Sequence, residues 1–316
     1  MTSRRPRPNR PPRCIQRVSY ERAGLHYDVY EPARSARKTF ILLHGLTLEG
    51  ENDPRLIRLA TCLAFARLRI VALRLPGLMA CRFDPGDVQA IAKMIQCLSA
   101  GRQEPIGLIG FSLGAGLGLI AAALPEVKND IDSLFLFGSY SRLRDLQVHF
   151  MKLAQQAPQQ EDDWDAFIWI RLVLAYRQID RLSVDQADRE EIQNHLMRYC
   201  HGLSLRDKRG FFDRVLKDLP VDRAALLLDD QLLEQLSPAH RLHDIKGRVY
   251  LLHDAHDRIV PPDHSIGIFD QLCRLGQEDR VHLLISPLLS HVSVPKVSAM
   301  AEALRLLRMI SAVFVL

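Results

Sequence analysis

Residues 106–118 read IGLIGFSLGAGLG, and this stretch decides the fold of the chain. Its first part, Ile106–Ile109, is a short apolar run that predicts a buried strand. Its last part opens a helix of small residues, predicted over Leu113–Leu124 and ended by Pro125. A strand, a tight glycine-framed turn and a helix in this order are typical of a parallel sheet covered by helices.

The same alternation of strand and helix extends outward on both sides. Further strands are predicted as two short segments around Ala23-Gly24 within Val18–Tyr30, and at Thr39–Leu43, Arg69–Leu73, Ile131–Phe137, Val249–Leu252 and Val281–Ile285. Helices are predicted behind Asp53-Pro54, over about Asp87–Leu98, near Ser265–Leu275 and from about Val297. We therefore predict an α/β fold, a doubly wound and mostly parallel sheet with helices on both faces.

The alternation stops between Ser139 and about Lys246, where charged and apolar residues mix in a helical composition. We expect a helical cap insertion over residues 139–246 in a core formed by residues 16–138 and 247–316. Within the insertion, Trp164–Tyr176 is strongly apolar. It fits the buried face of a cap helix, an acyl-binding lid, or both.

The net charge of +5 belongs to one end of the chain. Residues 1–13 hold five arginines and no acidic residue, so the rest of the chain sums to zero. Residues 1–15 form a Pro- and Arg-rich tail that we expect to be disordered, because it has little apolar surface to bury. The basic charge therefore does not predict a nucleic-acid partner.

No run of 18 apolar residues and no secretory signal is visible, so no membrane span is expected. The six cysteines are scattered without metal-type spacing, which favours reduced, mostly buried thiols and a cytoplasmic location. The pairs His240/His243 and His253/His256 are better explained as loop histidines than as metal ligands, so we expect no metal site.

Ser112 is the candidate nucleophile, because it lies between a predicted strand and helix and is framed by Gly110 and Gly114. Side chains at both glycine positions would collide in so tight a turn. A serine hydroxyl needs a histidine base that a carboxylate holds, in the chain order Ser, acid, His. Ser286 and Ser290 have no glycine framing and are poor alternatives.

Candidates for the acid and the base follow two later strands. The loop after Val249–Leu252 holds His253, Asp254 and Asp257, and the segment after Val281–Ile285 ends in His291. Each lies just past the carboxyl end of a predicted strand, at the same sheet edge as Ser112.

These motifs resemble those of the α/β-hydrolase fold superfamily, in the branch of dienelactone-hydrolase-like and lysophospholipase-like serine esterases. The resemblance extends from about residue 18 to the C-terminus, apart from the insertion. His44-Gly45-Leu46 resembles the His-Gly motif of the family, and Asp257-Arg258-Ile259-Val260-Pro261 resembles its D-x-I-V-P loop. The resemblance implies a triad of Ser112, Asp257 and His291, and an oxyanion hole formed by the backbone amides of Leu46 and Leu113. It implies no cofactor.

The sequence departs from the family pattern at two loops. His253 is followed by Asp254 where the family usually has glycine, which puts two carboxylates in the acid loop. The spacing to Ile-Val-Pro favours Asp257. The loop that often holds an aspartate and Gly-x-Gly instead reads Arg74-Leu75-Pro76-Gly77-Leu78-Met79, which alters the expected substrate pocket.

Hydrolysis of a partly apolar carboxylic ester or thioester is the expected function. An acyltransferase with the same serine chemistry is the nearest alternative. A non-catalytic binding module on the same fold is the alternative from another class. A peptidase is less favoured, because proline-specific members have Trp-Gly-Gly after the serine, whereas Leu113-Gly114-Ala115 stands here.

Overall fold

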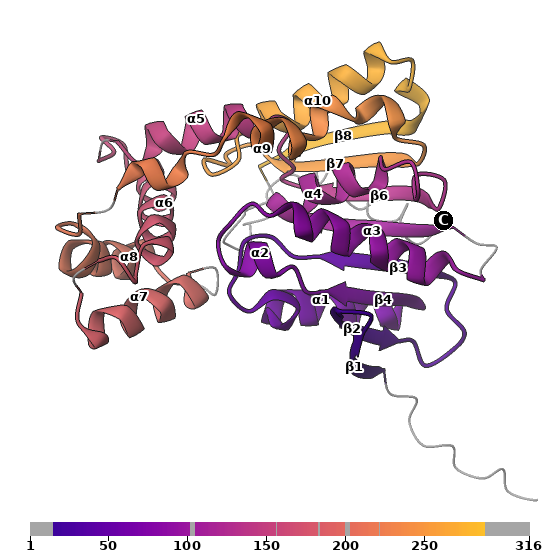
Figure 1. The fold of residues 1–316 in the computed structure, drawn as a ribbon, viewed down its shortest axis with the longest axis horizontal. Coiled ribbons are helices and arrows are strands. Elements are labelled where there is room, and N and C mark those ends of the chain that lie inside the picture. Colours follow the sequence, from indigo (N-terminus) through magenta and orange to yellow (C-terminus); the bar gives the residue numbers. More distant parts are fainter. Residues whose placement is uncertain are drawn as a thin grey trace, which may run out of the picture.

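The computed structural model describes residues 15–101, 105–155, 157–182, 184–199, 203–220 and 222–287. In these ranges, eight strands form one sheet in the order β1-β2-β4-β3-β5-β6-β7-β8 (Figure 1). The strands are β1 (Gln16–Arg22), β2 (Leu25–Glu31), β3 (Lys38–Leu43), β4 (Leu68–Leu73), β5 (Ile106–Phe111), β6 (Ile131–Phe137), β7 (Arg248–Asp254) and β8 (Val281–Ser286).

Strands β1 and β2 form a hairpin at one edge, and the other strands run parallel to one another. The hairpin turns at Ala23 and Gly24, which both have positive φ angles of 56° and 74°. Such angles suit the two-residue turns that match the twist of paired strands. β2 joins the parallel strands through an antiparallel pairing with β4. The predicted mostly parallel, doubly wound sheet is confirmed.

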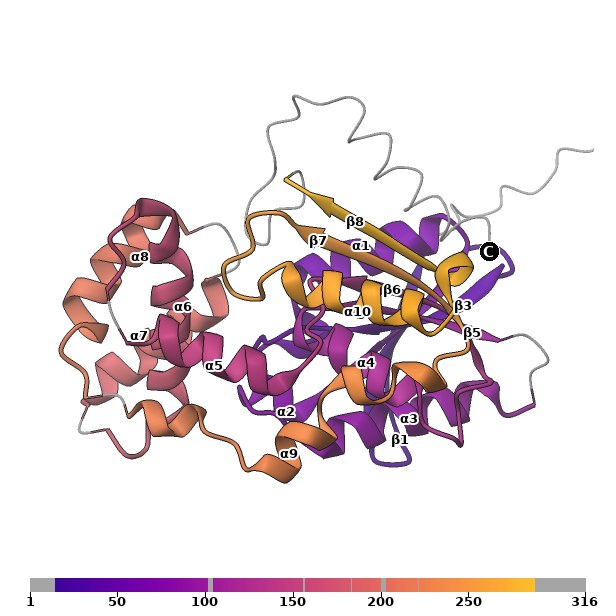
Figure 2. The same ribbon diagram turned by 90° about the horizontal axis from the view of Figure 1, so that it is seen from above.

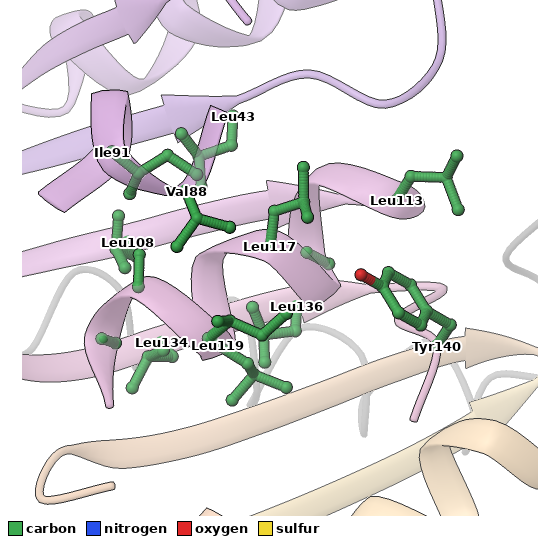
Figure 3. Packing of buried hydrophobic residues seen from close by; sticks show 14 of the residues in the cluster. Leu43, Val88, Ile91, Leu108, Leu113, Leu117, Leu119, Leu134, Leu136 and Tyr140 are labelled. Carbon is green, nitrogen blue, oxygen red and sulfur yellow. The ribbon is translucent and has the colours of Figure 1, made fainter. Parts of the chain in front are cut away.

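Helices cover both faces of the sheet (Figure 2). One face is covered by α1 (Pro54–Phe65), and the other by α3 (Pro85–Ser99), α4 (Leu113–Ala122) and α10 (Asp263–Arg274). Alternate residues of β3 belong to the two apolar clusters: Phe40 and Leu42 pack on the α1 side, and Ile41 and Leu43 on the other. Figure 3 shows the cluster on the face covered by α3, α4 and α10. There, Leu43, Leu108 and Leu136 of the strands meet Val88 of α3 and Leu117 of α4.

Between β6 and β7 the described chain forms α5 (Leu143–Leu153), α6 (Trp164–Arg177), α7 (Gln186–Arg198), α8 (Leu205–Phe211) and α9 (Asp230–Gln235). Helices α5 and α9 add Leu146 and Leu233 to the core beside the sheet. Helices α6, α7 and α8, called the outer helices below, pack around a third apolar cluster that includes Ile168 and Phe211. They lie beyond one end of the sheet, at the left of Figures 1 and 2.

Short elements complete the described fold. A helix α2 (Pro76–Met79) follows β4 where no helix was predicted, because its four residues are too few to produce a periodic apolar pattern. Short 3₁₀ turns lie at Gly50–Asn52, Glu161–Asp163, Arg223–Leu226, Pro238–His240, Leu242–Asp244 and Glu278–Arg280, and a π turn at Phe212–Leu216.

One expectation from the sequence is wrong, and two others concern residues that the structure does not describe. Of the four described cysteines only Cys81 is buried, so the prediction of mostly buried thiols is wrong; Cys62 and Cys97 lie exposed on helical surfaces. Among the residues that the structure describes, no helix is both long and apolar enough to span a bilayer. The basic tail up to residue 14 and the closing helix expected from Val297 lie outside the described residues.

Candidate active site

Ser112 lies on the sharp turn that joins β5 to α4, at the carboxyl end of the sheet. Its φ of 50° and ψ of −123° are unusual for a residue with a side chain and store local strain. The Ser112 amide donates to the Phe137 carbonyl of β6 at 2.7 Å, and the Ala115 amide donates to the Ser112 carbonyl at 3.0 Å. These two bonds hold the strained turn, while the half-buried side chain lines a cavity.

Gly110 and Gly114 occupy positions where a side chain cannot fit. A Cβ at Gly114 would lie 2.1 Å from the carbonyl oxygen of His44, and one at Gly110 would lie 2.6 Å from the Cα of Ala115. Both contacts involve backbone atoms, which cannot move aside as a flexible side chain would. The glycines therefore let the turn close and let the loop after β3 approach it.

The loop after β3 is fixed by the imidazole of His44, which is 1% exposed. The Leu75 amide donates to Nε2 at 3.0 Å, so Nε2 is an acceptor and Nδ1 carries the hydrogen. Nδ1 then donates to the Gly45 carbonyl at 2.7 Å. Burial lowers the pKa of His44, although its bond to Gly45 acts in the opposite direction, and the ring is held neutral.

This bond orients the peptide group between Gly45 and Leu46. In a planar trans peptide the carbonyl and the amide hydrogen point in opposite directions. The Leu46 amide is therefore directed away from His44. In the described part of the chain, neither this amide nor that of Leu113, the first residue of α4, donates a hydrogen bond. Leu46 and Leu113 line the same cavity as Ser112.

The loop after β7 holds both candidate acids in different surroundings. Asp257 is 5% exposed, and its Oδ1 accepts the amides of Ile259 and Val260 at 2.9 and 3.0 Å. Asp254 lines the cavity, and its Oδ1 accepts the His256 amide at 3.0 Å.

His253 lies in the interior between this loop and α10. Its Nε2 lies 2.7 Å from the Val260 carbonyl and 3.4 Å from Oδ2 of Asp257, and its Nδ1 lies 2.7 Å from the Ser265 hydroxyl. Both ring nitrogens contact fixed neighbours, and the ring is fully buried. His253 therefore fits the structural role that its sequence position indicates.

The predicted base, His291, lies outside the described residues. The described part of its segment is β8, which runs parallel to β7 and ends at Ser286. The carboxyl end of β8 is thus at the same sheet edge as Ser112 and Asp257. Ser290 also lies outside the described residues.

The cavity in front of Ser112 has a volume of about 400 Å³. Gly45, Leu46, Ser112 and Leu113 form its wall at the sheet, and α6 contributes Trp169, Ile170, Val173 and Arg177 from the outer helices. The size is that of a small-molecule site, and most of the lining side chains are apolar. The cavity thus lies between the sheet edge and the outer helices.

The sequence did not reveal the individual roles of two side chains of this site. His44 was recognised only as part of a motif, because its bonds to Gly45 and Leu75 depend on the fold. Arg177 was not singled out, although Trp169, Val173 and Arg177 recur at a spacing of four that places them on one helix face.

The paired histidines have other neighbours in the part of the chain that the structure describes. No group of three or more His, Cys, Asp or Glu side chains within the described ranges is arranged to hold a metal ion. His240 instead lies 2.9 Å from a carboxylate oxygen of Glu234, and His243 lies 3.1 Å from one of Asp244.

Comparison with known proteins agrees with the fold. The family model described as "alpha/beta hydrolase fold" matches residues 38–283. A serine hydrolase from the polyaromatic-hydrocarbon-degrading bacterium Cycloclasticus zankles is 14% identical, with a TM-score of 0.54, and the match covers 94% of this chain and 97% of that one. The structure of VinJ is 15% identical with a TM-score of 0.54, covering 94% and 98% of the two chains.

A larger protein matches over part of its length. The acylaminoacyl peptidase of Pyrococcus horikoshii is 14% identical with a TM-score of 0.50, and the match covers 88% of this chain but only 37% of the peptidase. No curated protein matches the chain in a sequence comparison. At these identities the solved structures show a shared fold.

Proposed function

Because the chain belongs to the α/β-hydrolase fold family, we propose that it is a serine hydrolase that cleaves a carboxylic ester or thioester through an acyl-enzyme on Ser112. The observation that carries this proposal is the backbone of Ser112. A serine with a φ of 50°, between glycines that no other residue can replace without a clash, lines a cavity at the carboxyl edge of a parallel sheet. A serine with only a structural role has no need of this strain.

The first step is attack of Ser112 Oγ on the substrate carbonyl. The carbonyl oxygen becomes an oxyanion, and the Leu46 and Leu113 amides are the donors that we assign to it. Their free hydrogens and their common cavity support this assignment. Removal of one such donor typically costs about 3 kcal/mol of transition-state stabilisation.

His291 is the proposed general base, and Asp257 the carboxylate that orients it. The buried, amide-bonded position of Asp257 supports this choice over Asp254, because a fixed carboxylate can hold an imidazole in one tautomer. His291 takes the Ser112 proton and passes it to the leaving group. It then deprotonates the water that attacks the acyl-enzyme and returns the proton to Ser112 Oγ, so the carboxylic acid is released and the serine hydroxyl is regenerated. No cofactor takes part.

We also propose that residues 139–246 act as a cap on a core of residues 16–138 and 247–316. The apolar wall that α6 adds to the cavity supports this role and a partly apolar substrate. The cytoplasmic location and the disordered tail of residues 1–15 remain predictions.

A fluorophosphonate probe tests the proposal, since it reacts covalently with an activated serine. We expect one labelled site in the wild-type protein and no labelling of Ser112→Ala or His291→Ala. Ser139→Ala is the matched control, because Ser139 is a buried serine near the same sheet edge that does not line the cavity. A folded wild-type protein that stays unlabelled would favour the non-catalytic binding module.

Competition between water and an added alcohol then separates hydrolysis from acyl transfer. We expect the free acid as the main product from an ester substrate. Formation of mostly the new ester would instead identify an acyltransferase with the same Ser112 chemistry.

A further inference from the structure

The cavity in front of Ser112 contains a cation, Arg177, for which the described residues provide no counter-ion. Arg177, the last residue of α6, lines the cavity and is half-buried. Within the described ranges its guanidinium makes no hydrogen bond and no ion pair, although this group has five N–H donors. Buried charges are normally paired, so a free arginine facing a cavity requires an explanation.

The other charged residues of the cavity are engaged. Arg55 donates to Asp53 through Nε and Nη2, and Asp53 also accepts the Arg55 amide at the start of α1. Asp254 accepts the His256 amide. Neither carboxylate is bonded to Arg177.

The charges nearest to Arg177 do not neutralise it. Burial lowers the pKa of the Arg177 guanidinium, the neighbouring thiol of Cys81 opposes this, and the positive charge of Arg82 lowers the pKa further. Burial also raises the pKa of the Cys81 thiol to about 12, so this neighbour is neutral at physiological pH. Arginine nevertheless stays protonated in proteins. The cavity therefore has a positive charge that no group in the described part of the chain balances.

Arg177 lies at the end of an apolar row. Trp169 and Val173 precede it at intervals of four residues, and all three line the cavity. Eight residues of helix span about 12 Å, so the row resembles a short apolar wall that ends in a guanidinium. A molecule along this wall would place hydrocarbon against Trp169 and Val173 and an anion at Arg177.

We infer that Arg177 is a specificity-determining residue that binds an anionic group, a carboxylate or a phosphate, carried by the ester or thioester substrate. This inference rests on the proposed function of Ser112. The anion lies at a distance from the scissile carbonyl, with an apolar segment between them. It is carried either by the acyl chain or by the leaving group.

Two pairs of probes separate these positions. For the acyl side, ethyl p-nitrophenyl alkylphosphonates, which are neutral diesters, are compared at increasing chain length with the same compounds ending in a carboxylate. Ser112 Oγ forms a bond to phosphorus while p-nitrophenolate leaves, so the rate constant of irreversible labelling is measured without turnover. For the leaving-group side, kcat/KM is compared between phenyl hexanoate and 4-carboxyphenyl hexanoate.

The readout is the rate constant for the charged probe divided by that for the neutral probe: the labelling rate constant on the acyl side and kcat/KM on the leaving-group side. This ratio is measured in wild type, Arg177→Gln, Arg177→Lys and Arg82→Gln. Hydrogen bonds to charged groups predict that Arg177→Gln lowers the ratio by roughly tenfold to a hundredfold in one pair, with neutral probes unaffected. On the acyl side, we expect the wild-type ratio to be highest at one chain length and this maximum to vanish in Arg177→Gln. Arg177→Lys should restore part of the ratio.

Arg82→Gln removes the same charge from an exposed neighbour that does not line the cavity, and should stay within twofold of wild type. Ratios unchanged by Arg177→Gln in both pairs would overturn the inference while leaving Ser112 as nucleophile. Equal losses for charged and neutral probes would also overturn it, because they indicate a structural role. Absence of any labelling at Ser112 in wild type would contradict the proposed function and this inference with it.

Discussion

At the scale of single residues, the site depends on how side chains hold backbone groups. His44 has no free ring nitrogen, since Nε2 accepts from Leu75 and Nδ1 donates to Gly45. Its role in the proposed chemistry is therefore positional: it fixes the peptide group whose amide belongs to Leu46. The sequence indicated the His-Gly motif, but the partner Leu75 is 31 residues away and becomes apparent only in the fold.

Replacing His44 tests this role. We expect His44→Ala to lower kcat by roughly a hundredfold with little change in KM, because an oxyanion donor acts mainly in the transition state. His44→Asn, which keeps a short side-chain N–H donor, should recover part of kcat. Steady-state kinetics on a neutral ester measures both constants.

His240→Ala serves as the control, because this exposed histidine pairs with Glu234 and neither residue lines the cavity. An equal rise in KM and fall in kcat for His44→Ala, with no recovery in His44→Asn, would indicate a general loss of structure instead of a misplaced donor.

At the scale of elements, the unit of β5, turn and α4 determines where the chemistry occurs. The strand, the turn and the start of the helix were all predicted from residues 106–118, because each has a distinct local pattern. The start of α1 was equally clear: Asp53 accepts the Arg55 amide, and Pro54 is the first helical residue. The side of α6 that faces the cavity was not predictable, because apolar residues surround this buried helix and leave no polar face to orient it.

Gly114→Ala tests the close approach between the turn and the loop after β3. The added Cβ would lie 2.1 Å from the His44 carbonyl oxygen, so one of the two segments must move. We expect a loss of stability of about 1–3 kcal/mol, as for other overpacked positions, and a loss of fluorophosphonate labelling of Ser112. Urea unfolding and labelling rate are measured on the same sample.

Gly210→Ala is the matched control. Gly210 lies in α8, is exposed, and has open space where a Cβ would be added. It should gain up to about 1 kcal/mol from better helix propensity and keep full labelling. Normal labelling of Gly114→Ala would contradict the proposed arrangement of the turn.

At the scale of the whole molecule, the sheet has a core on each face and the outer helices have a third. Leu46 and Ile259 pack against both the core on the α3, α4 and α10 face and the apolar cluster of the outer helices. The sheet and the outer helices therefore meet at the cavity, which both residues line. The sequence predicted the sheet because strand and helix periods differ sharply. It did not predict the cavity, which forms between segments far apart in the chain, or the position of Arg177 within it.

Buried neutral histidines make the stability of the whole fold depend on pH. Burial lowers the pKa of His264 to about 4, and its Nδ1 accepts the Ser141 amide at 3.3 Å. Between pH 6.5 and about 4, the unfolded chain binds a proton at this residue and the folded chain does not. The free energy of unfolding should therefore fall as pH falls through this window, and His264 should account for roughly 2 kcal/mol of the loss at pH 4.5.

His264→Asn keeps an acceptor for the Ser141 amide but cannot be protonated. Urea unfolding at pH 7 and pH 4.5 should show a smaller loss of stability in this variant than in wild type. His243→Asn, at an exposed position, should behave as wild type. An equal loss in all three proteins would show that other groups determine the acid sensitivity.

The most direct test of the account is to isolate the covalent intermediate on Ser112. The protein is mixed with a p-nitrophenyl ester, quenched with acid within milliseconds to seconds, digested and analysed by mass spectrometry. We predict a burst of p-nitrophenolate, with the acyl group on the peptide that contains Ser112 and on no peptide of Ser112→Ala. An acyl group attached to another residue, or steady ester cleavage without any acylated peptide, would contradict the account.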